Sequence, residues 1–412
     1  MYTYINKSLH CDNIPLNSIA KKYGTPVFVY DRSIIRNNFT RYTKAFASVP
    51  HRICYAVKAN SNISILRDLK NLGSGADIVS GGELFKALRA GIDPGRIVYS
   101  GVGKTEEEIR YALREEILMF NVESLDELIA INKVARKLMV KAPVAFRINP
   151  DIDALTHKHI TTGKKENKFG IHFPHVIEHF LEARKLMHIE IVGIQAHIGS
   201  QLLTVQPYIA TVKKLVEIIK SLEMLGIRIT YVDIGGGLGI QYNNREHPPA
   251  PHKLARAVIP MIRKTGLTLI LEPGRSICGD AGVLLTRVLY KKKTDMKHFI
   301  VVDAAMNDLM RPVLYDAYHD IIPVQKRKRS KIIRADIVGP ICETGDHFTK
   351  GRPMPEPEHN DILCIKAAGA YGFAMSSQYN SRLRAAEVMV TGSKTKLIRE
   401  REDYGDLVDQ EV

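Results

Sequence analysis

The residues of this chain that could carry chemistry follow short apolar runs, at the points where strands would end. Lys58 closes the run RICYAVK (52–58), and Glu272 and Arg275 lie in EPGR (272–275), directly after LTLIL. A lysine amine in a desolvated cavity loses its proton more readily and can form a Schiff base. A lysine is more commonly a solvated surface charge, so the position of Lys58 in the fold decides between the two interpretations.

A glycine-rich segment and a nearby serine could bind a phosphate group. Gly236 and Gly237 lie in GGGLG (235–239), where backbone N–H groups can approach a phosphate closely because no side chain intervenes. Ser200 in AHIGSQ (196–201) could add a hydroxyl donor. The alternatives are a tight turn for the glycines and a helix cap for the serine. The glycines do not form a G-x-G-x-x-G dinucleotide motif.

A phosphate site combined with a cavity lysine suggests pyridoxal 5′-phosphate as the cofactor. A carboxylate beside the pyridine nitrogen keeps that nitrogen protonated, which makes the ring a strong electron sink. Glu272 is the candidate for this role, and an ion pair with Arg275 is the alternative. His197 could lie flat against the ring, or it could be a hydrogen-bonded core histidine.

An alternating series of strands and helices over residues 26–275 must position these groups. Eight apolar, β-branched runs begin near residues 52, 76, 96, 117, 144, 189, 228 and 267, and amphipathic segments separate them. This alternation predicts parallel strands, and eight units in about 250 residues favour a (β/α)8 TIM barrel over an open doubly wound sheet. Gly91 is the expected end of one helix and Thr105 the expected N-cap of the next. The active site of a barrel lies at the carboxyl ends of its strands, where the residues above are found.

The pattern changes after residue 275 and predicts a second, mostly β domain over 276–412. Strand-like runs occur at 282–293, 298–306, 331–340, 361–372 and 385–390. We expect residues 1–25 to join this domain, and we expect the Pro-rich segment 347–360 to be a loop. The polar segment 153–167 could be either a lid or a plain surface loop.

Composition describes an ordinary globular protein of 412 residues, 45% hydrophobic and 25% charged. No apolar run approaches the ~18 residues of a membrane span, and the N-terminus lacks the pattern of a secretory signal. The five cysteines are widely spaced with no CxxC pair, which favours a cytoplasmic location and argues against a disulfide framework or a metal site.

The net charge of +15 raises a second hypothesis, a nucleic-acid or surface-binding protein built on an inactive barrel. The densest basic clusters are KKK (291–293) and KRKRSK (326–331). Neither contains aromatic residues that could stack on bases. We therefore expect solvated surface there, and neither a nucleic acid nor a membrane as partner.

Eight motifs occur in order along the chain: YAVKAN, ADIVSGGEL, NKFGI, AHIGSQ, VDIGGGLGI, EPGRS, GPICETGD and GAYGFAMSSQYN. Together they resemble the barrel-type pyridoxal-phosphate decarboxylases of basic amino acids. The resemblance implies a (β/α)8 barrel with a β domain, an alanine-racemase-like arrangement, in a homodimer with shared active sites. The order Cys342-Glu343-Thr344 is similar to the type that converts meso-2,6-diaminopimelate to L-lysine and CO2, the last step of lysine biosynthesis. Decarboxylation of ornithine, arginine or a carboxynorspermidine-like substrate is the alternative.

The resemblance also implies roles for individual residues. Lys58 matches the Schiff-base lysine, and Cys342 matches the acid that reprotonates the substrate carbon. The expected cofactor contacts are Lys58, His197, Ser200, Gly236, Gly237, Glu272, Gly274, Arg275 and Tyr371. The expected substrate contacts are Arg275, Arg311, Tyr315, Glu343 and Tyr371.

Overall fold

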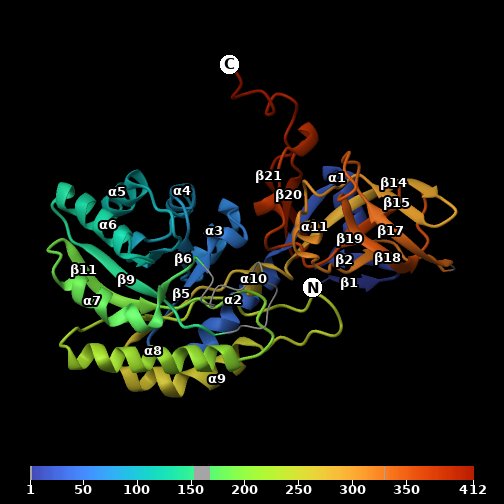
Figure 1. Cartoon of the computed structure of the whole chain (residues 1–412). Helices are drawn as coiled ribbons and strands as arrows, with labels where there is room; N and C mark the ends of the chain where they lie inside the picture. Colours follow the sequence, from blue (N-terminus) through green and yellow to red (C-terminus); the bar gives the residue numbers. More distant parts are fainter. Residues whose placement is uncertain (1, 153–167, 329) are drawn as a thin grey trace. The chain divides into compact units, whose positions relative to one another are not determined.

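The computed structural model describes residues 2–152, 168–328 and 330–412, and the chain divides into two compact units (Figure 1). The barrel unit contains residues 38–240 and 247–276. The β unit contains residues 1–37, 241–246 and 277–412. The expected lid or surface loop at 153–167 lies outside the described residues.

The barrel unit is built on eight parallel strands in the order β9-β11-β12-β13-β5-β6-β7-β8, and β8 pairs back onto β9 to close the barrel. The short strand β10 (Ile171–His172) extends β9 on one side. This closure confirms the predicted (β/α)8 fold and excludes the open sheet. The barrel strands are β5 (His51–Ala56), β6 (Gly75–Ile78), β7 (Ile97–Tyr99), β8 (Met119–Val122), β9 (Ala142–Asn149), β11 (Ile189–Gln195), β12 (Tyr231–Asp233) and β13 (Thr268–Leu271).

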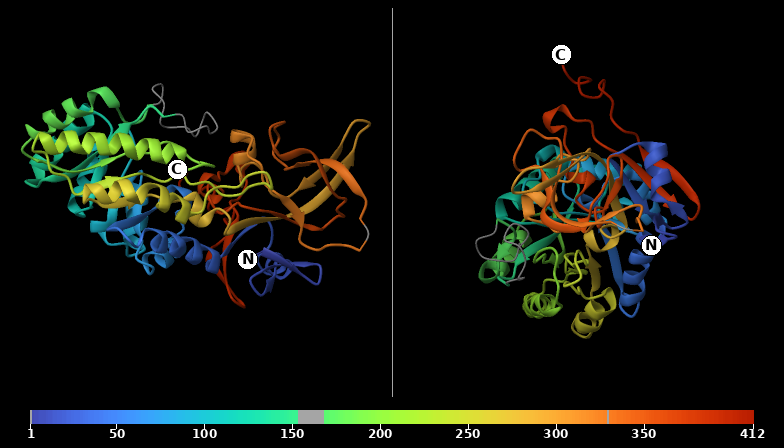
Figure 2. Two further views of the ribbon diagram at one scale, coloured as in Figure 1. Left: turned by 90° about the horizontal axis from the view of Figure 1, so that it is seen from below. Right: turned by 90° about the vertical axis from the view of Figure 1, so that its right-hand side faces the viewer.

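Helices follow the barrel strands, and Figure 2 shows α8 and α9 side by side on the outside of the unit. Their ends form where the sequence predicts. Thr105 caps α5 with its side chain, and Glu108 completes a capping box. Gly91 follows α4 with a φ of +83°, a backbone conformation that favours glycine at a helix end. The helices are α2 (Arg32–Phe46), α3 (Ile63–Lys70), α4 (Gly81–Arg89), α5 (Glu106–Arg114), α6 (Leu125–Leu138), α7 (Val176–Arg184), α8 (Gln206–Met224) and α9 (Pro251–Ile262).

Apolar side chains from five strands form a cluster inside the barrel. Cys54, Val98, Met119, Ala145 and Ile270 are fully buried against one another. Because helices cover the outer face, the strands are buried on both faces and read as nearly continuous apolar runs. Polar side chains within such runs therefore need a specific reason to be there.

The β unit contains a nine-stranded sheet and a separate three-stranded sheet. The small sheet is formed by β1 (Tyr2–Ile5), β2 (Ser8–Cys11) and β3 (Ile14–Pro15), and α1 (Leu16–Tyr23) follows it. Leu9, Leu16 and Ile19 pack into the core of the unit. The large sheet and its partners are β4 (Val27–Asp31), β14 (Gly282–Lys293), β15 (His298–Val302), β16 (Ile321–Pro323), β17 (Ile332–Val338), β18 (His347–Pro355), β19 (Ile362–Ile365), β20 (Ala386–Thr391) and β21 (Lys394–Arg399). The short helices α10 (Arg275–Cys278) and α11 (Arg311–Tyr315) complete the elements used below.

Two details differ from the sequence-based expectations. Strand β4 lies between β14 and β20 in the large sheet, so residues 27–31 belong to the β unit although we expected the barrel to begin at residue 26. The segment 347–360 is not only a loop, because residues 347–355 form strand β18 against β17. Strand β18 lies at the edge of the sheet and pairs with β17 on one side only. Pro353 and Pro355 lack an N–H group, which an edge strand tolerates because its other side has no neighbouring strand to bond.

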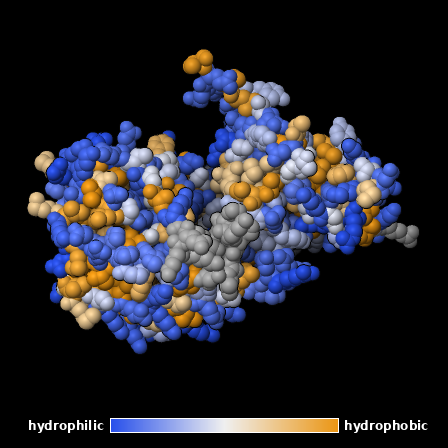
Figure 3. Space-filling model, in the orientation of Figure 1, coloured by the Kyte–Doolittle hydropathy of each residue, from blue (hydrophilic) through white to orange (hydrophobic). Residues whose placement is uncertain are grey.

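Part of the basic surface is neutralised locally. Lys291 of the first cluster lies 2.7 Å from Glu358, and Arg327 of the second lies 2.7 Å from Asp361. Figure 3 shows hydrophilic residues over most of the face in view, with apolar residues scattered among them. Within the described part of the chain, no helix is long and apolar enough to cross a membrane.

Candidate active site

Lys58 lies directly after β5, in the short 3-10 helix Val57–Ala59. Its Nζ atom is 2.6 Å from Oδ2 of Asp77, which lies in β6 and whose side chain is fully buried. The other oxygen of Asp77 has no hydrogen-bond partner among the described residues. Sequence reasoning missed Asp77, although an acidic residue inside the buried run ADIV was a signal for it.

Two buried carboxyl groups follow the neighbouring strands β12 and β13. Asp233 ends β12 and Glu272 follows β13, and their side chains are 0% and 3% exposed. Burial raises the pKa of Asp233 to about 6. Burial, and then the negative charges of Asp233 and Asp77, raise the pKa of Glu272 well above its usual value. The two groups resist ionising together, so the site favours a proton or a cation beside them.

Side-chain amides surround Glu272 rather than an arginine. Asn121 on β8 donates from Nδ2 to Oε1 at 3.3 Å, and Gln195 on β11 donates from Nε2 to Oε2 at 3.4 Å. The Oδ1 atom of Asn121 and the Oε1 atom of Gln195 are buried, and neither has a hydrogen-bond partner in the part of the chain that the structure describes. The guanidinium of Arg275 donates instead to Ser200 Oγ, at 3.0 and 3.3 Å. The considered ion pair between Glu272 and Arg275 is therefore not the contact that these side chains make.

His197 is in direct contact with the glycine segment 235–239. The N–H of Gly236 donates to His197 Nδ1 at 3.2 Å, so that nitrogen carries no proton. Burial lowers the pKa of His197 well below its usual value, and the positive charges of Arg147 and Lys58 add to this effect. A Cβ atom on Gly236 would lie 2.1 Å from the carbonyl oxygen of Glu272, and one on Gly237 would lie 2.2 Å from that of Gly199. Only glycine allows the chain to pass this close to its neighbours.

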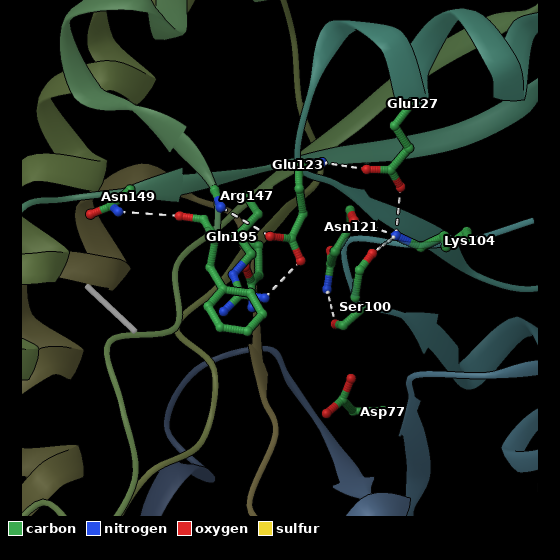
Figure 4. A network of polar contacts seen from close by, with 12 residues as sticks. Asp77, Ser100, Lys104, Asn121, Glu123, Glu127, Arg147, Asn149 and Gln195 are labelled. Carbon is green, nitrogen blue, oxygen red and sulfur yellow. Dashed lines mark hydrogen bonds and ion pairs between the residues drawn. The ribbon is translucent and has the colours of Figure 1, made fainter. Parts of the chain in front are cut away.

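A buried network of charged groups supports this rim (Figure 4). Arg147 Nη1 donates to Glu123 at 2.8 Å, and Lys104 Nζ donates to Glu127 at 2.6 Å. The second oxygen of Glu123 accepts from the N–H of Gly170, the residue directly before β10. Sequence reasoning missed this network because its members are distant along the chain.

The remaining expected residues lie in the β unit. Arg311 and Tyr315 begin and end α11. Val313 of α11 packs with Ile341, the residue before Cys342. The N–H of Cys342 donates to Asn380 Oδ1 at 3.0 Å.

Glu343 and Tyr371 are the other expected site residues that lie in the β unit. Glu343 accepts a 2.7 Å hydrogen bond from the hydroxyl of Tyr379. Tyr371 has a φ of +56°. Helix α11 and the Cys342-Glu343 segment are thus brought together within this unit, whereas Lys58, His197, Ser200, Gly236, Glu272 and Arg275 gather in the barrel unit.

The family model described as the pyridoxal-binding domain of pyridoxal-dependent decarboxylases matches residues 32–279. The chain belongs to this family. It is 50% identical over 406 residues to diaminopimelate decarboxylase of Aquifex aeolicus (strain VF5), covering 98% of this chain and 96% of that protein. It is 48% identical over 400 residues to diaminopimelate decarboxylase of Vibrio cholerae serotype O1, covering 97% and 95% of the two chains.

Solved structures of related proteins agree with this assignment. Diaminopimelate decarboxylase of Helicobacter pylori, complexed with L-lysine, superposes with a TM-score of 0.93 at 45% identity over 96% of this chain and 99% of that chain. Lysine/ornithine decarboxylase of Vibrio vulnificus, complexed with putrescine, superposes with a TM-score of 0.80 over 92% of this chain and 97% of that chain. Its 18% identity shows the shared fold alone.

The residues of the barrel rim fit a pyridoxal cofactor. Gly236 and Gly237 have no side chains that could block an approach to their backbone, as a phosphate site requires, and Ser200 beside Arg275 offers a hydroxyl and a cation to an anion. The buried Glu272 would gain a compensating charge from a protonated ring nitrogen. Among the described residues, no group of histidine, cysteine and acidic side chains could hold a metal ion.

Proposed function

We propose that this chain converts meso-2,6-diaminopimelate to L-lysine and CO2 with pyridoxal 5′-phosphate, as the last step of lysine biosynthesis. The observation that carries the proposal is the gathering of Lys58, neutral His197 and the buried Glu272 on the rim of a barrel. Diaminopimelate decarboxylases at 47–50% identity over nearly the whole chain support the choice of substrate.

Each residue of the barrel rim would bind a different part of the cofactor. Lys58 would hold the cofactor through Nζ, and Asp77 accepts a hydrogen bond from that nitrogen. Glu272 would keep the ring nitrogen protonated, and His197 would lie against the ring as a neutral group. Bound in this way, the cofactor supplies an electron sink for the bond that breaks on loss of CO2. Ser200, Gly236, Gly237, Gly274 and Arg275 would hold the phosphate and its surroundings.

The β unit would supply substrate recognition and a proton. Arg311 would bind the distal carboxylate of the substrate, because a guanidinium can pair with a carboxylate through two hydrogen bonds. Glu343 would accept from the distal ammonium group. Cys342 would give the proton that takes the place of the departing carboxyl group. Tyr315 and Tyr371 would complete the contacts.

A homodimer with shared active sites belongs to the proposal. Cys342 is exposed in the described chain, as a residue that serves a partner's site would be. Mixing an inactive Lys58→Ala variant with an inactive Cys342→Ala variant should restore part of the activity, because one of the two sites in a mixed dimer would be intact. Mixtures that stay inactive although mixed dimers form would contradict the shared site. The free thiols of all five cysteines also fit the expected cytoplasmic location.

The purified enzyme mixed with meso-diaminopimelate tests the reaction itself. We expect equal amounts of L-lysine and CO2, and loss of both products in Lys58→Ala. Release of CO2 from ornithine but not from diaminopimelate would show that the substrate assignment is wrong while the decarboxylase chemistry stands.

A further inference from the structure

A histidine that no expected role includes contacts Arg311 inside the β unit. Nε2 of His319 lies 2.8 Å from Nη1 of Arg311, and His319 is fully buried. The guanidinium of Arg311 also lies over the ring of Tyr242, 4.6 Å from its centre. Tyr242 and His319 pack edge to face with ring centres 5.4 Å apart. The side chains of His319 and Tyr242 thus meet around the guanidinium of Arg311.

The contacts of its two ring nitrogens determine the protonation state of His319. A guanidinium can only donate, so Nε2 accepts from Arg311 and carries no proton. The carbonyl oxygen of Lys366 can only accept, so Nδ1, at 2.8 Å from it, carries the proton. His319 is therefore a neutral imidazole in one defined tautomer. A second proton would place two cationic donors against each other at the same 2.8 Å.

Helix α11 needs this outside support. It is a single turn of five residues, and Arg311 is its first residue. A helix this short gains little stability from its own hydrogen bonds, and an arginine side chain has many rotamers. His319 is itself held at both ends, because its backbone carbonyl accepts from Arg352 and its ring donates to Lys366. Because His319 is fixed, its contact with Arg311 holds the guanidinium in one position.

We propose that neutral His319 is a positioning residue that orients Arg311 for the distal carboxylate of the substrate. The inference rests on the proposed function, since it takes the distal carboxylate as the ligand of Arg311. His319 touches neither substrate nor cofactor in this role. An ordered guanidinium lowers the entropy cost of substrate binding. Loss of His319 should therefore change mainly KM and have little effect on kcat.

Two variants and one matched control test the proposal in the holoenzyme. His319→Leu removes the acceptor, and we expect KM for diaminopimelate to rise about tenfold with kcat changed less than threefold, as for loss of one hydrogen bond to a charged group. His319→Gln keeps an acceptor oxygen at the end of the side chain and should restore most of the affinity. His359→Gln is the control, because His359 is exposed and its ring lies against the backbone oxygen of Leu289 and the ring of Tyr290, neither of which belongs to the site.

Inhibition by two diamines separates positioning from a general structural effect. L-lysine keeps the carboxylate at the end that is not decarboxylated, and 1,5-diaminopentane lacks it. We expect His319→Leu to raise the inhibition constant of L-lysine about tenfold and leave that of 1,5-diaminopentane unchanged. Equal changes for both inhibitors, or a His319→Gln variant as impaired as His319→Leu, would overturn the proposal. A wild-type enzyme that does not decarboxylate diaminopimelate would instead overturn the proposed function and this inference with it.

Discussion

Replacing Gly236 with alanine should damage the cofactor site through backbone displacement. The added Cβ would lie 2.1 Å from the carbonyl oxygen of Glu272 and 3.0 Å from its carbonyl carbon. These are backbone atoms and cannot rotate away. The carbonyl of Gly236 is also fixed, because it accepts a 2.7 Å hydrogen bond from the buried hydroxyl of Tyr208.

The size of the effect follows from the overlap. Contacts below 3.0 Å are essentially never seen for real Cβ atoms, so the two chain segments must separate by about 0.9 Å. Overpacking of this kind costs about 3 kcal/mol, which lowers the Tm of a unit this size by roughly 6–12 °C. A misplacement of about 1 Å at a reacting centre costs about 100-fold in rate. Because Glu272 lies at the point of collision, cofactor affinity should fall at least about tenfold.

Three measurements test this reasoning: the dissociation constant of pyridoxal phosphate, thermal unfolding and CO2 release. Gly103→Ala is the matched control, because an added Cβ there meets nothing within 4 Å and the backbone is not left-handed. We expect the control to stay within about 0.5 kcal/mol of the wild type. If Gly236→Ala binds the cofactor as tightly as Gly103→Ala does, the close approach of this glycine has no part in cofactor binding, and our interpretation fails.

Further predictions concern the buried carboxyl groups and the Cys342 segment. Glu272→Gln should lower kcat at least about tenfold with KM little changed, because a neutral amide cannot keep a ring nitrogen protonated; an unchanged kcat would contradict the role. In the cofactor-free enzyme, the folded pKa of Asp233, about 6, lies above its ordinary value of 3.8, so the folded state binds more protons between these values. Stability should therefore fall as the pH rises through that window, and urea unfolding of Asp233→Asn should show a smaller fall. Tyr379→Phe removes the donor to Glu343 and should raise KM for diaminopimelate a few-fold while the dissociation constant of pyridoxal phosphate stays constant.

The barrel and the strand-end residues could be predicted because their signals are local. Each strand of a parallel barrel is a short apolar run, and each run here is followed by a helical pattern. The position of Lys58 after such a run was therefore enough to place it on the rim. The order of the eight motifs along the chain then indicated the family, which no single motif identifies.

The contacts across the rim could not be predicted, because they depend on which strands become neighbours. Asp77 and Lys58 meet because β5 and β6 are adjacent. Asn121 reaches Glu272 although 151 positions separate them. In the β unit, Pro353 and Pro355 suggested a loop, whereas their place at a sheet edge removes the conflict with a strand.

The pKa shifts of His197 and Glu272 explain how one buried site can contain both groups before the cofactor binds. Burial lowers the pKa of the histidine and raises that of the carboxyl group, so both shifts favour the neutral form. A protonated ring nitrogen would change the balance for Glu272, because it brings the opposite charge beside that carboxyl group. The same ring stacked on His197 would displace water without adding a partner charge to Nδ1, which already accepts from Gly236. Cofactor binding should therefore ionise Glu272 and leave His197 neutral. Both side chains are buried, but Glu272 would provide a charge for the ring nitrogen, whereas His197 would provide an uncharged surface for the ring.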